Sequence, residues 1–456
     1  MHTIDKTIFR EYDIRGIVDS QLQDDVVERI AAAFAALLVR SGKDSAVVGM
    51  DGRPSSPRFK KIVNRTLAKY GIHVTDIGLV PTPVMYYTLF KRGLGGGIMI
   101  TASHNPPEYN GFKAMVGHDT LAGDQIRGLY DLAVNQDFPA EKNASISQVS
   151  MNHEYMDEIM ASLNMGRRLK AVVDCGNGTA GITAMPLYEK MGVDVTGLYT
   201  EVDGSFPNHH PDPTKAENLK DLIAKVKETG ADLGLGFDGD ADRIGVVDGG
   251  GRILWGDQLL VLLARDVLSR HPGRTVISEV KASEVLYDEI RKAGGKAIMW
   301  KAGHSLIKKK IFEENAVLAG EVSGHIFFND HWYGFDDGVY VGARLLEILS
   351  NSDRSLAELR DSIPTRQNTP EQYVDIPEEI KFAVVEKVVE TFRSEYEVID
   401  IDGARVKFPF GWALVRASNT QPALVIRFEA DTQAHLEEIR SKVLSELDRI
   451  RRQFPA

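Results

Sequence analysis

The sequence predicts an α/β fold in which three α/β units of similar size precede a C-terminal α+β unit. The first observation is the length: 456 residues exceed what one hydrophobic core usually serves, so we expect three or four domains of roughly 100–150 residues each. The second is the alternation of short apolar runs with helical patterns, which indicates parallel or mixed sheets covered by helices. The third is a change beyond residue 365, where the predicted strands become adjacent.

The first unit opens with a helix, predicted over residues 24–40 because apolar residues recur at helical spacing and Ser41-Gly42 supplies a stop. Residues 101–113 combine paired prolines with asparagine and glycine, so we predict a shaped loop there rather than a strand or helix. The elements expected between them are strands at 46–50, 72–77 and 97–100 and helices at 57–70 and 83–91.

The alternation restarts at residue 169 and again near residue 255. The second unit is expected to contain strands at 169–174 and 231–237 with a helix at 217–228. The third is expected to contain strands at 275–279, 297–300 and 316–319. Its helices are expected to lie before residue 268, where the first one ends, and at 284–293 and 305–313. The last should hold helix 378–393, two hairpin strands around Asp402-Gly403, and strand 424–429 before a closing helix. The predicted domains are residues 1–150, 151–255, 256–365 and 366–456.

The composition is that of an ordinary globular protein, with 43% hydrophobic and 26% charged residues. A net charge of −11 disfavours nonspecific binding to nucleic acid or anionic membranes, so we expect small-molecule partners, no nucleic acid and no membrane. The single cysteine, Cys175, excludes an internal disulfide and is expected to be a buried small side chain. We find no signal peptide, and the most apolar helical stretch, residues 30–39, is too short to span a bilayer. A cytoplasmic location is expected.

Ser103 lies in the shaped loop between a small residue and a histidine, with Lys113 ten positions on. A hydroxyl held in a cationic loop suggests a nucleophile or a phosphate carrier. The alternative is a surface turn whose serine bonds only to the backbone.

Asp238, Asp240 and Asp242 follow an apolar strand at alternate positions, so that their carboxylates can converge on one hard cation. A calcium EF-hand is excluded because its sixth and twelfth loop positions, where glycine and glutamate are needed, hold Arg243 and Gly249. Mg²⁺ is expected, because it needs few protein oxygens and leaves room for a phosphate oxygen. An acidic, solvated turn remains the alternative.

Two further clusters contain groups that suit a phosphorylated sugar. Glu321 and Ser323 lie two residues apart, and on an extended backbone their side chains would point the same way. A site that binds two neighbouring hydroxyl groups of a sugar requires this arrangement. Residues 416–422, together with Arg427, place hydroxyl and amide side chains in a turn between arginines, which suits a phosphate dianion. Local bonding at a strand end and a plain turn are the respective alternatives. Residues 176–178 are interpreted as a structural turn, because they lack the lysine of a Walker motif.

These four motifs, in this order and over the whole length, resemble the α-D-phosphohexomutase family. Within this family, the sequences of three segments are most similar to those of the phosphomannomutase/phosphoglucomutase branch. These segments are Thr101-Ala102-Ser103-His104-Asn105-Pro106-Pro107, Asp238-Gly239-Asp240-Ala241-Asp242-Arg243 and Gly320-Glu321-Val322-Ser323-Gly324-His325. The resemblance implies three related α/β domains with mixed sheets and a smaller α+β domain around a central cleft. It also implies reversible transfer of phosphate between C1 and C6 of mannose and glucose phosphates, through a 1,6-bisphosphate that turns around while bound.

The resemblance assigns roles residue by residue. Ser103 would be the phosphoserine, and its phosphate would complete an Mg²⁺ site made by Asp238, Asp240 and Asp242. The reacting phosphate would meet Arg15 and Lys113, with Arg243 beside the metal. The residues implied in proton handling or sugar contact are Tyr12, Lys281, His304, Glu321, Ser323 and His325. The residues implied in holding the distal phosphate are Arg416, Ser418, Asn419, Thr420 and Arg427.

The expected cofactors are Mg²⁺ and a catalytic hexose 1,6-bisphosphate, the partners are hexose phosphates, and the expected state is a monomer or a weak homodimer. Three alternatives stay open. A phosphoglucosamine mutase would differ only in the sugar. A phosphatase would use Asp238 as its nucleophile and leave Ser103 incidental. A sugar-phosphate-binding regulator would bind without turnover.

Overall fold

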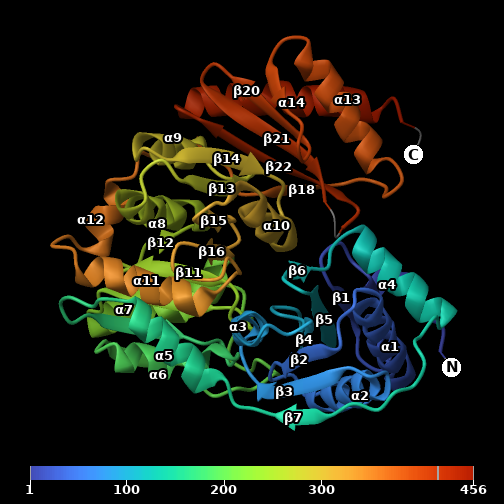
Figure 1. The fold of residues 1–456 in the computed structure, drawn as a ribbon. Coiled ribbons are helices and arrows are strands. Elements are labelled where there is room, and N and C mark those ends of the chain that lie inside the picture. Colours follow the sequence, from blue (N-terminus) through green and yellow to red (C-terminus); the bar gives the residue numbers. More distant parts are fainter. Residues whose placement is uncertain (1, 419–420, 455–456) are drawn as a thin grey trace.

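The computed structural model describes residues 2–418 and 421–454, which form four sheets that follow one another along the chain. Three of these sheets are mixed and covered by helices, and the last is antiparallel, so the predicted fold class is confirmed. We call the sheets and their helices the first, second, third and C-terminal units. Figure 1 shows the first unit in blue to teal, the second in green, the third in yellow and orange, and the C-terminal unit in red.

The first unit contains a seven-stranded sheet in the order β1-β5-β4-β2-β3-β7, with β6 beside β5. Strands β2, β3, β4 and β7 are parallel, whereas β5 is antiparallel to both β4 and β1. Helices α1, α2 and α4 pack on one face and α3 on the other, because alternate residues of each strand point to opposite faces. The bounds are η1 Lys6–Ile8, β1 Ile14–Ile17, α1 Asp24–Arg40, β2 Ser45–Met50, α2 Ser56–Lys69, β3 His73–Leu79, α3 Thr82–Arg92, β4 Gly96–Ile100, β5 Tyr109–Val116, β6 Asp119–Thr120, α4 Asp124–Asn135 and β7 Ile146–Gln148.

The second and third units repeat one pattern, in which three parallel strands are followed by an antiparallel strand. Their sheet orders are β12-β11-β10-β8-β9 and β14-β13-β15-β16, with β11 and β16 antiparallel to β10 and β15. The second unit has α5 Asn152–Ser162, β8 Lys170–Asp174, α6 Ala180–Lys190, β9 Asp194–Leu198, η2 Ala216–Leu219, α7 Lys220–Thr229, β10 Leu233–Phe237, β11 Ile244–Asp248 and β12 Ile253–Leu254. The third has α8 Gly256–Arg270, β13 Thr275–Glu279, α9 Glu284–Lys292, β14 Lys296–Trp300, α10 His304–Glu314, β15 Leu318–Gly320, β16 Ile326–Phe328, α11 Gly338–Ser350 and α12 Leu356–Asp361.

The C-terminal unit is an antiparallel sheet in the order β17-β22-β21-β20-β19, with β18 also pairing with β22. Helices α13 and α14 pack against it, as expected for an α+β domain. The two strands predicted around Asp402-Gly403 are β19 and β20, which pair antiparallel. The bounds are β17 Gln367–Asn368, β18 Gln372–Asp375, α13 Lys381–Arg393, β19 Glu397–Ile399, β20 Ala404–Phe408, β21 Gly411–Ala417, β22 Ala423–Ala430 and α14 Gln433–Arg451.

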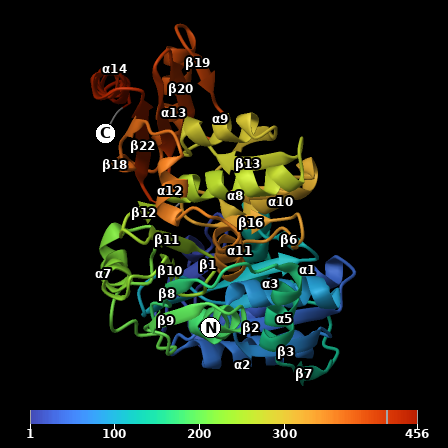
Figure 2. The same cartoon turned by 90° about the vertical axis from the view of Figure 1, so that its left-hand side faces the viewer.

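The hydrophobic cores divide the molecule differently from the sheets. One continuous cluster of buried side chains joins the first three units, from Val47 through Val173 to Leu349. The C-terminal unit has its own cluster, from Ile376 to Ile450. Figure 2 shows this unit in red at one end of the molecule, beside the third unit in yellow. The C-terminal unit is therefore joined to the rest mainly by its interface with the third.

Each unit has a hairpin that leads toward the centre of the molecule. The loops between β4 and β5, β10 and β11, and β15 and β16 hold three of the predicted motifs: the Ser103 loop, the aspartates 238–242 and residues 321–325. Of the fourth, predicted over residues 416–422, residues 416 and 417 end β21, and the described residues 418, 421 and 422 lie between β21 and β22. In the first three units this loop joins a parallel strand to its antiparallel neighbour. Topologically equivalent positions therefore contain different chemical groups.

The predicted loop over residues 101–113 is wrong in its second part, because strand β5 begins at Tyr109. Gly111, which the predicted loop includes, instead pairs with Arg15 of β1. A Cβ at Gly111 would lie 2.1 Å from the carbonyl oxygen of Ile14. Glycine is needed there for the close approach of two strands. The helix expected at 217–228 also differs, since it begins with a 3-10 turn and becomes α-helical at Lys220.

No helix within residues 2–418 and 421–454 has both the length and the apolar character required to cross a membrane.

Candidate active site

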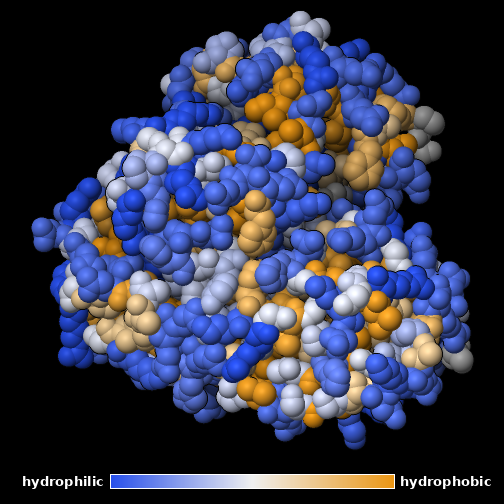
Figure 3. Space-filling view, viewed as in Figure 1, coloured by the Kyte–Doolittle hydropathy of each residue, from blue (hydrophilic) through white to orange (hydrophobic). Residues whose placement is uncertain are grey.

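A cleft with a volume of ≈ 450 Å³ lies where the hairpin loops of the four units meet. Figure 3 shows a hollow between the upper lobe, formed by the C-terminal unit, and the lower right lobe, formed by the first. The predicted arrangement of domains around a central cleft is therefore confirmed. The predicted residues that line the cleft are Tyr12, Arg15, Arg243, Lys281, His304, Glu321, Ser323, His325, Arg416 and Ser418.

Ser103 lies beneath the cleft, with only 1% of its surface exposed. Its backbone has φ +51°, the left-handed region that residues with a Cβ seldom adopt, so the turn holds some strain. The backbone N–H of Ser103 donates to Thr101 Oγ1 at 2.8 Å, and its hydroxyl donates to Asp238 Oδ2 at 2.6 Å. The serine therefore faces the carboxylates of the second unit rather than bulk solvent.

Arg53 fixes the backbone of the Ser103 loop through hydrogen bonds. The sequence analysis did not single it out. Its guanidinium donates to four backbone carbonyls of the loop, those of Ser103, Asn105, Pro106 and Tyr109, at 2.6–2.9 Å. It also lies 3.1 Å from Asp51. Its position in the sequence could have identified Arg53 as a candidate, because residues 51–53 directly follow the carboxyl end of a parallel strand, where functional loops are common.

Asp238, Asp240 and Asp242 converge, and each is fully buried. One oxygen from each lies within 4.8 Å of the others. Lys113 Nζ donates to Asp240 Oδ2 at 2.7 Å and also to Asp242. The remaining oxygens, Asp240 Oδ1 and Asp242 Oδ1, have no hydrogen-bond partner among the residues described. Unpartnered buried carboxylate oxygens are the groups that a hard cation would satisfy, so these residues fit a divalent metal.

The charges of this cluster are unbalanced in the protein alone. Burial raises the pKa of Asp238 well above its usual range, and repulsion by Asp240 and Asp242 adds to this effect. Burial would also raise the pKa of Asp240, but the ammonium of Lys113 outweighs burial and keeps that pKa low. Carboxylates on either side of Lys113 likewise overcome burial and raise its pKa. A divalent cation would relieve the remaining repulsion.

Glycines let the serine and aspartate loops lie directly against each other. A Cβ at Gly239 would lie 2.5 Å from the carbonyl oxygen of Ser103, and one at Gly178 would lie 2.7 Å from that of Gly239. The turn at residues 176–178 thus supports the aspartate loop, in agreement with its structural interpretation. Cys175, which lies beside this turn, is buried and forms no disulfide, as predicted.

The loop at residues 321–325 lines the cleft, but its predicted extended form is wrong. Strand β15 ends at Gly320, and the N–H of Gly324 donates to the carbonyl of Glu321 at 3.1 Å, which closes a turn. Glu321 Oε1 accepts a hydrogen bond from the N–H of Gly303 at 2.7 Å. The turn arises because β16 must return antiparallel after only five residues.

His304 and His325 stack in the wall of the cleft, with ring centroids 5.1 Å apart. Arg243 Nε donates to His325 Nε2 at 2.9 Å. Burial holds the pKa of His304 well below its usual value, and the charge of Lys308 acts in the same direction. His304 is therefore a neutral imidazole at neutral pH.

The rim of the cleft includes several contacts that cross between units. Tyr12 of the first unit donates from its hydroxyl to the carbonyl of Ala302 at 2.8 Å. Asp402 of the C-terminal unit accepts from the N–H of the same Ala302 at 3.0 Å and pairs with Arg416 at 3.1 Å. Lys281 lies 3.0 Å from Glu371 and 3.5 Å from Glu279. Sequence reasoning missed all three acidic partners: Glu279, Glu371 and Asp402.

The predicted phosphate turn is only partly described. Ser418 Oγ accepts a hydrogen bond from the N–H of Gln421 at 3.2 Å, and Lys381 donates to the Ser418 carbonyl at 2.6 Å. Asn419 and Thr420 lie outside the described residues. Arg427 faces away from the cleft: it donates to the carbonyl of Lys281 and lines a separate hollow near Trp255.

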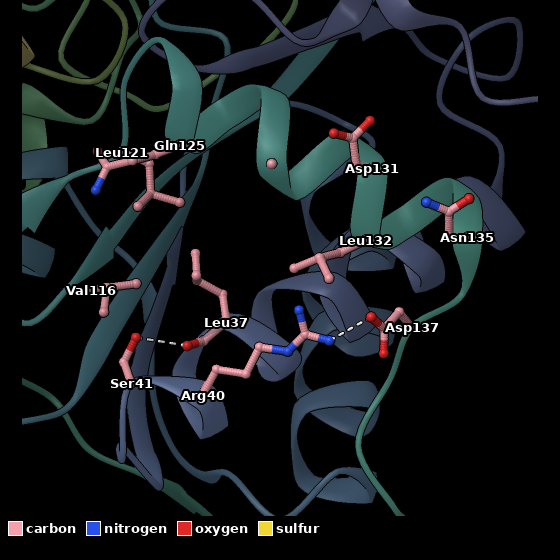
Figure 4. Close-up of a pocket in the computed structure, with 11 residues that line it drawn as sticks. Leu37, Arg40, Ser41, Val116, Leu121, Gln125, Asp131, Leu132, Asn135 and Asp137 are labelled. Atoms are coloured by element: carbon pink, nitrogen blue, oxygen red, sulfur yellow. Dashed lines mark hydrogen bonds and ion pairs between the residues drawn. The ribbon is translucent and has the colours of Figure 1, made fainter.

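A second hollow, ≈ 470 Å³ in volume, lies between α1 and α4 on the outside of the first unit. Figure 4 shows two pairings there, between Arg40 and Asp137 and between Ser41 and the carbonyl of Leu37. Their distances are 2.6 Å and 2.8 Å. The residues that line it include no predicted site residue from the described part of the chain. The reactive groups are therefore gathered at the central cleft.

Comparison with known proteins agrees with this arrangement. Models of the phosphoglucomutase/phosphomannomutase family match four segments: alpha/beta/alpha domain I at residues 6–139, domain II at 153–251, domain III at 255–366 and the C-terminal domain at 371–446.

Relatives match over nearly the full length. The chain is 47% identical to a phosphomannomutase/phosphoglucomutase of Pseudomonas aeruginosa, over 99% of this chain and 98% of the relative. It is 47% identical to a phosphoglucomutase of Neisseria gonorrhoeae, over 97% of each chain. A crystal structure of a phosphoglucomutase/phosphomannomutase family protein from Burkholderia thailandensis superimposes with a TM-score of 0.92 at 42% identity, over 98% of each chain. With its four units, its serine beside three convergent aspartates and these full-length relatives, the chain belongs to the phosphoglucomutase/phosphomannomutase family of enzymes.

Proposed function

We propose that the protein interconverts the 1-phosphates and 6-phosphates of mannose and glucose, with Ser103 as the phosphate carrier. The observation that supports this most directly is the Ser103 hydroxyl, which lies 2.6 Å from Asp238 in the buried layer beneath a cleft lined by all four units, a layer that we call the floor. Phosphoryl transfer depends on positioning and charge neutralisation more than on covalent chemistry, and this floor offers both.

Asp238, Asp240 and Asp242 would hold Mg²⁺, and a phosphate oxygen on Ser103 would complete the site. Bound there, Mg²⁺ supplies charge neutralisation for the transferring phosphoryl group. Lys113 and Arg15 add positive charge on the side of the first unit, and Arg243 lies between the aspartates and the sugar-facing histidines. His304 and His325 are the proposed proton-handling residues.

Transfer between C1 and C6 requires the sugar to present both ends to one serine. The phosphoryl group of phosphorylated Ser103 passes to the free hydroxyl and forms a 1,6-bisphosphate, which turns around and returns its other phosphate to the serine. A catalytic supply of hexose 1,6-bisphosphate would maintain the phosphorylated enzyme. Glu321 and Ser323 are proposed to read hydroxyls in either orientation, with Tyr12 and Lys281 beside them.

The non-reacting phosphate is proposed to lie against Arg416 and Ser418, with Asn419 and Thr420 completing the turn. Arg427 would act on this site indirectly, through the backbone of Lys281, to which it donates. Because the C-terminal unit has a core of its own, we propose that it closes over the sugar as a hinged body. Equal hydrogen-exchange protection of residues 366–456 with and without sugar phosphate would contradict closure.

We further propose domain boundaries after residues 150, 255 and 365, which the grouping of strands into four sheets supports. We propose that the enzyme acts in the cytoplasm as a monomer or weak homodimer. Hexose phosphates are its proposed partners, without nucleic acid or membrane.

The test is a parallel assay of mannose, glucose and glucosamine 1-phosphates with Mg²⁺ and catalytic hexose bisphosphate. We expect turnover of the first two and near-complete loss in Ser103→Ala. Turnover of glucosamine phosphate alone would indicate a phosphoglucosamine mutase instead. Release of inorganic phosphate that survives Ser103→Ala would indicate a phosphatase that uses Asp238, and binding without isomerisation would indicate a regulator.

A further inference from the structure

Arg10 is a half-buried arginine in the wall of the cleft, in the segment between the 3-10 turn η1 and strand β1. Its backbone N–H donates to the carbonyl of Asp13 at 2.9 Å, but the carboxylate of Asp13 pairs with Arg15 instead, at 2.7 Å. Within residues 2–418 and 421–454 the guanidinium of Arg10 has no hydrogen bond or ion pair. Burial lowers the pKa of Arg10, and repulsion by Arg15 acts in the same direction. A partly buried cation without a counter-charge is costly, so a bound anion would stabilise it.

Arg10 also lines a hollow beside the cleft, ≈ 620 Å³ in volume, which we call the side hollow. Arg10, Glu11 and Arg15 line both the cleft and the side hollow, so the two spaces adjoin. The charged side chains that line the side hollow are four cations and one carboxylate: Lys6, Arg10, Arg15, Arg127 and Glu11. Glu11 lies 3.8 Å from Arg127. The excess of positive charge makes the side hollow favourable for an anion.

The proposed mutase reaction, on which this inference rests, creates an anion that needs more than two phosphate sites. The hexose 1,6-bisphosphate is proposed to place one phosphate at Ser103 and the other at Arg416, and it must turn around to exchange them. During the turn at least one phosphate has left its site, so the intermediate is held by fewer contacts and can escape. Arg10 lies beside Arg15, the proposed contact of the reacting phosphate, in the wall shared by the cleft and the side hollow.

We propose that Arg10 binds one phosphate of the hexose 1,6-bisphosphate in the side hollow while the sugar turns, and thereby keeps this intermediate on the enzyme. Its guanidinium offers a planar fork of N–H donors, which can bind two oxygens of one phosphate. No bond forms or breaks at Arg10, because both phosphoryl transfers take place at Ser103 Oγ. Arg10 therefore determines the fate of the intermediate and not the rate of transfer.

The escape of the intermediate in Arg10→Gln tests this role. Enzyme with ³²P on Ser103 is mixed with excess unlabelled glucose 1-phosphate and quenched within the first turnover. A retained intermediate becomes labelled glucose 6-phosphate, whereas an escaped one is labelled glucose 1,6-bisphosphate in solution. We expect the ratio of escaped to retained label to rise about 10–100-fold, the effect of losing a charge-assisted hydrogen bond. With saturating added glucose 1,6-bisphosphate, kcat should stay within about twofold of wild type.

Two further variants separate charge from structure. Arg10→Lys keeps the positive charge, so its escape ratio should stay within about threefold of wild type. Arg40→Gln removes an arginine that pairs with Asp137 in the outer hollow of the same unit, and it should change neither the escape ratio nor kcat. An unchanged escape ratio in Arg10→Gln would overturn the proposal. A fall in kcat of more than tenfold with saturating bisphosphate would also overturn it, because Arg10 would then act in the transfer itself.

A tungstate ion in crystals of the full chain gives a readout without activity. We expect its density beside Arg10 in wild type and not in Arg10→Gln. Tungstate there with an unchanged escape ratio would mean an adventitious ion only and would overturn the proposal. Wild-type protein that isomerises no hexose phosphate would refute the mutase function, while tungstate beside Arg10 would still show the anion site. Wild-type protein that isomerises hexose phosphates, with the same escape ratio as Arg10→Gln, would refute the role of Arg10 alone.

Discussion

The floor and the rim of the cleft are built in different ways. The floor consists of Ser103, the three aspartates and Lys113, all almost fully buried between the first and second units. These two units share one continuous hydrophobic core. The floor is therefore held rigidly, in the geometry that charge stabilisation of a phosphoryl group requires.

The rim is made of polar contacts between units whose cores are separate. Lys281 and Glu371 join the third and C-terminal units at 3.0 Å, and Asp402 joins them again through the N–H of Ala302. A small apolar cluster, Val280 with Trp412 and Leu414, accompanies these contacts. Polar contacts between domains exchange readily with water, so this construction of the rim is consistent with the proposed closure of the C-terminal unit. A bound sugar that must turn around needs this combination of a fixed floor and an adjustable rim.

The largest effect is expected at the floor, for Asp242→Asn. Loss of one carboxylate removes a proposed metal ligand and a partner of Lys113, so kcat should fall by about 10²–10³-fold, the range seen when a preorganised charge is removed from an active site. Steady-state isomerisation of glucose 1-phosphate measures this. Asp221→Asn, on helix α7 of the same unit, is the matched control and should retain activity. A variant that keeps more than half of wild-type kcat would show that the aspartates are not the metal site.

At the rim we expect a smaller effect, mainly on KM. Arg416→Lys keeps the positive charge but removes the fork that can bind a phosphate through two N–H groups. The loss of one charge-assisted hydrogen bond predicts a fall in kcat/KM of about 10–100-fold. Kinetics over a range of sugar phosphate concentrations would resolve the two constants. A fall confined to kcat would place Arg416 at the reacting phosphate instead of the distal one.

The sequence predicted the elements that repeat a clear pattern, and many of the candidate residues that it singled out lie in or beneath the cleft. The helix at residues 24–40 and the strand at 275–279 were predicted with their observed bounds, because their apolar periodicity is strong. Strand β11 and helix α11 were missed. The first follows the aspartate motif immediately, and the second is apolar on almost every side, so neither shows a period.

The residues that support the site were harder to find than those that form it. Arg53 and Asp402 act through contacts with segments far away in the sequence, at the Ser103 loop and Ala302. Their roles depend on tertiary packing, which no local pattern encodes. The turn at residues 321–325 was predicted as extended for a similar reason, since its shape follows from the pairing of β15 with β16.

Asp402→Asn should have a weaker effect than Arg416→Lys, because it loosens the arginine without removing it. Asp402 accepts from both Ala302 N–H and Arg416, and an amide oxygen can replace only one of these acceptors. We expect a roughly three- to tenfold rise in KM, within the range of one neutral hydrogen bond. Isomerisation kinetics measure it, with Asp400→Asn on the exposed side of the same turn as control. An unchanged KM would mean that the two loops are held without Asp402.

The smallest effect concerns stability at the rim and depends on pH. Burial raises the pKa of Glu279 to about 7, although Lys281 opposes this rise. The folded protein therefore keeps a proton on Glu279 at pH values where the unfolded chain has lost it. This contribution to the free energy of unfolding is complete below the unfolded pKa, about 4.3 for glutamate, and is lost as pH rises through about 7.

Glu279→Gln removes this titration and should flatten the pH dependence of stability. Chemical denaturation between pH 5 and pH 8 should show the wild type losing stability relative to the variant, by an amount on the order of 1–3 kcal/mol. Glu313→Gln, on the exposed side of α10 in the same unit, controls for the change from carboxylate to amide. Parallel curves for the wild type and Glu279→Gln would mean that Lys281 already compensates the charge of Glu279, so that this part of the rim is electrostatically balanced before any phosphate binds.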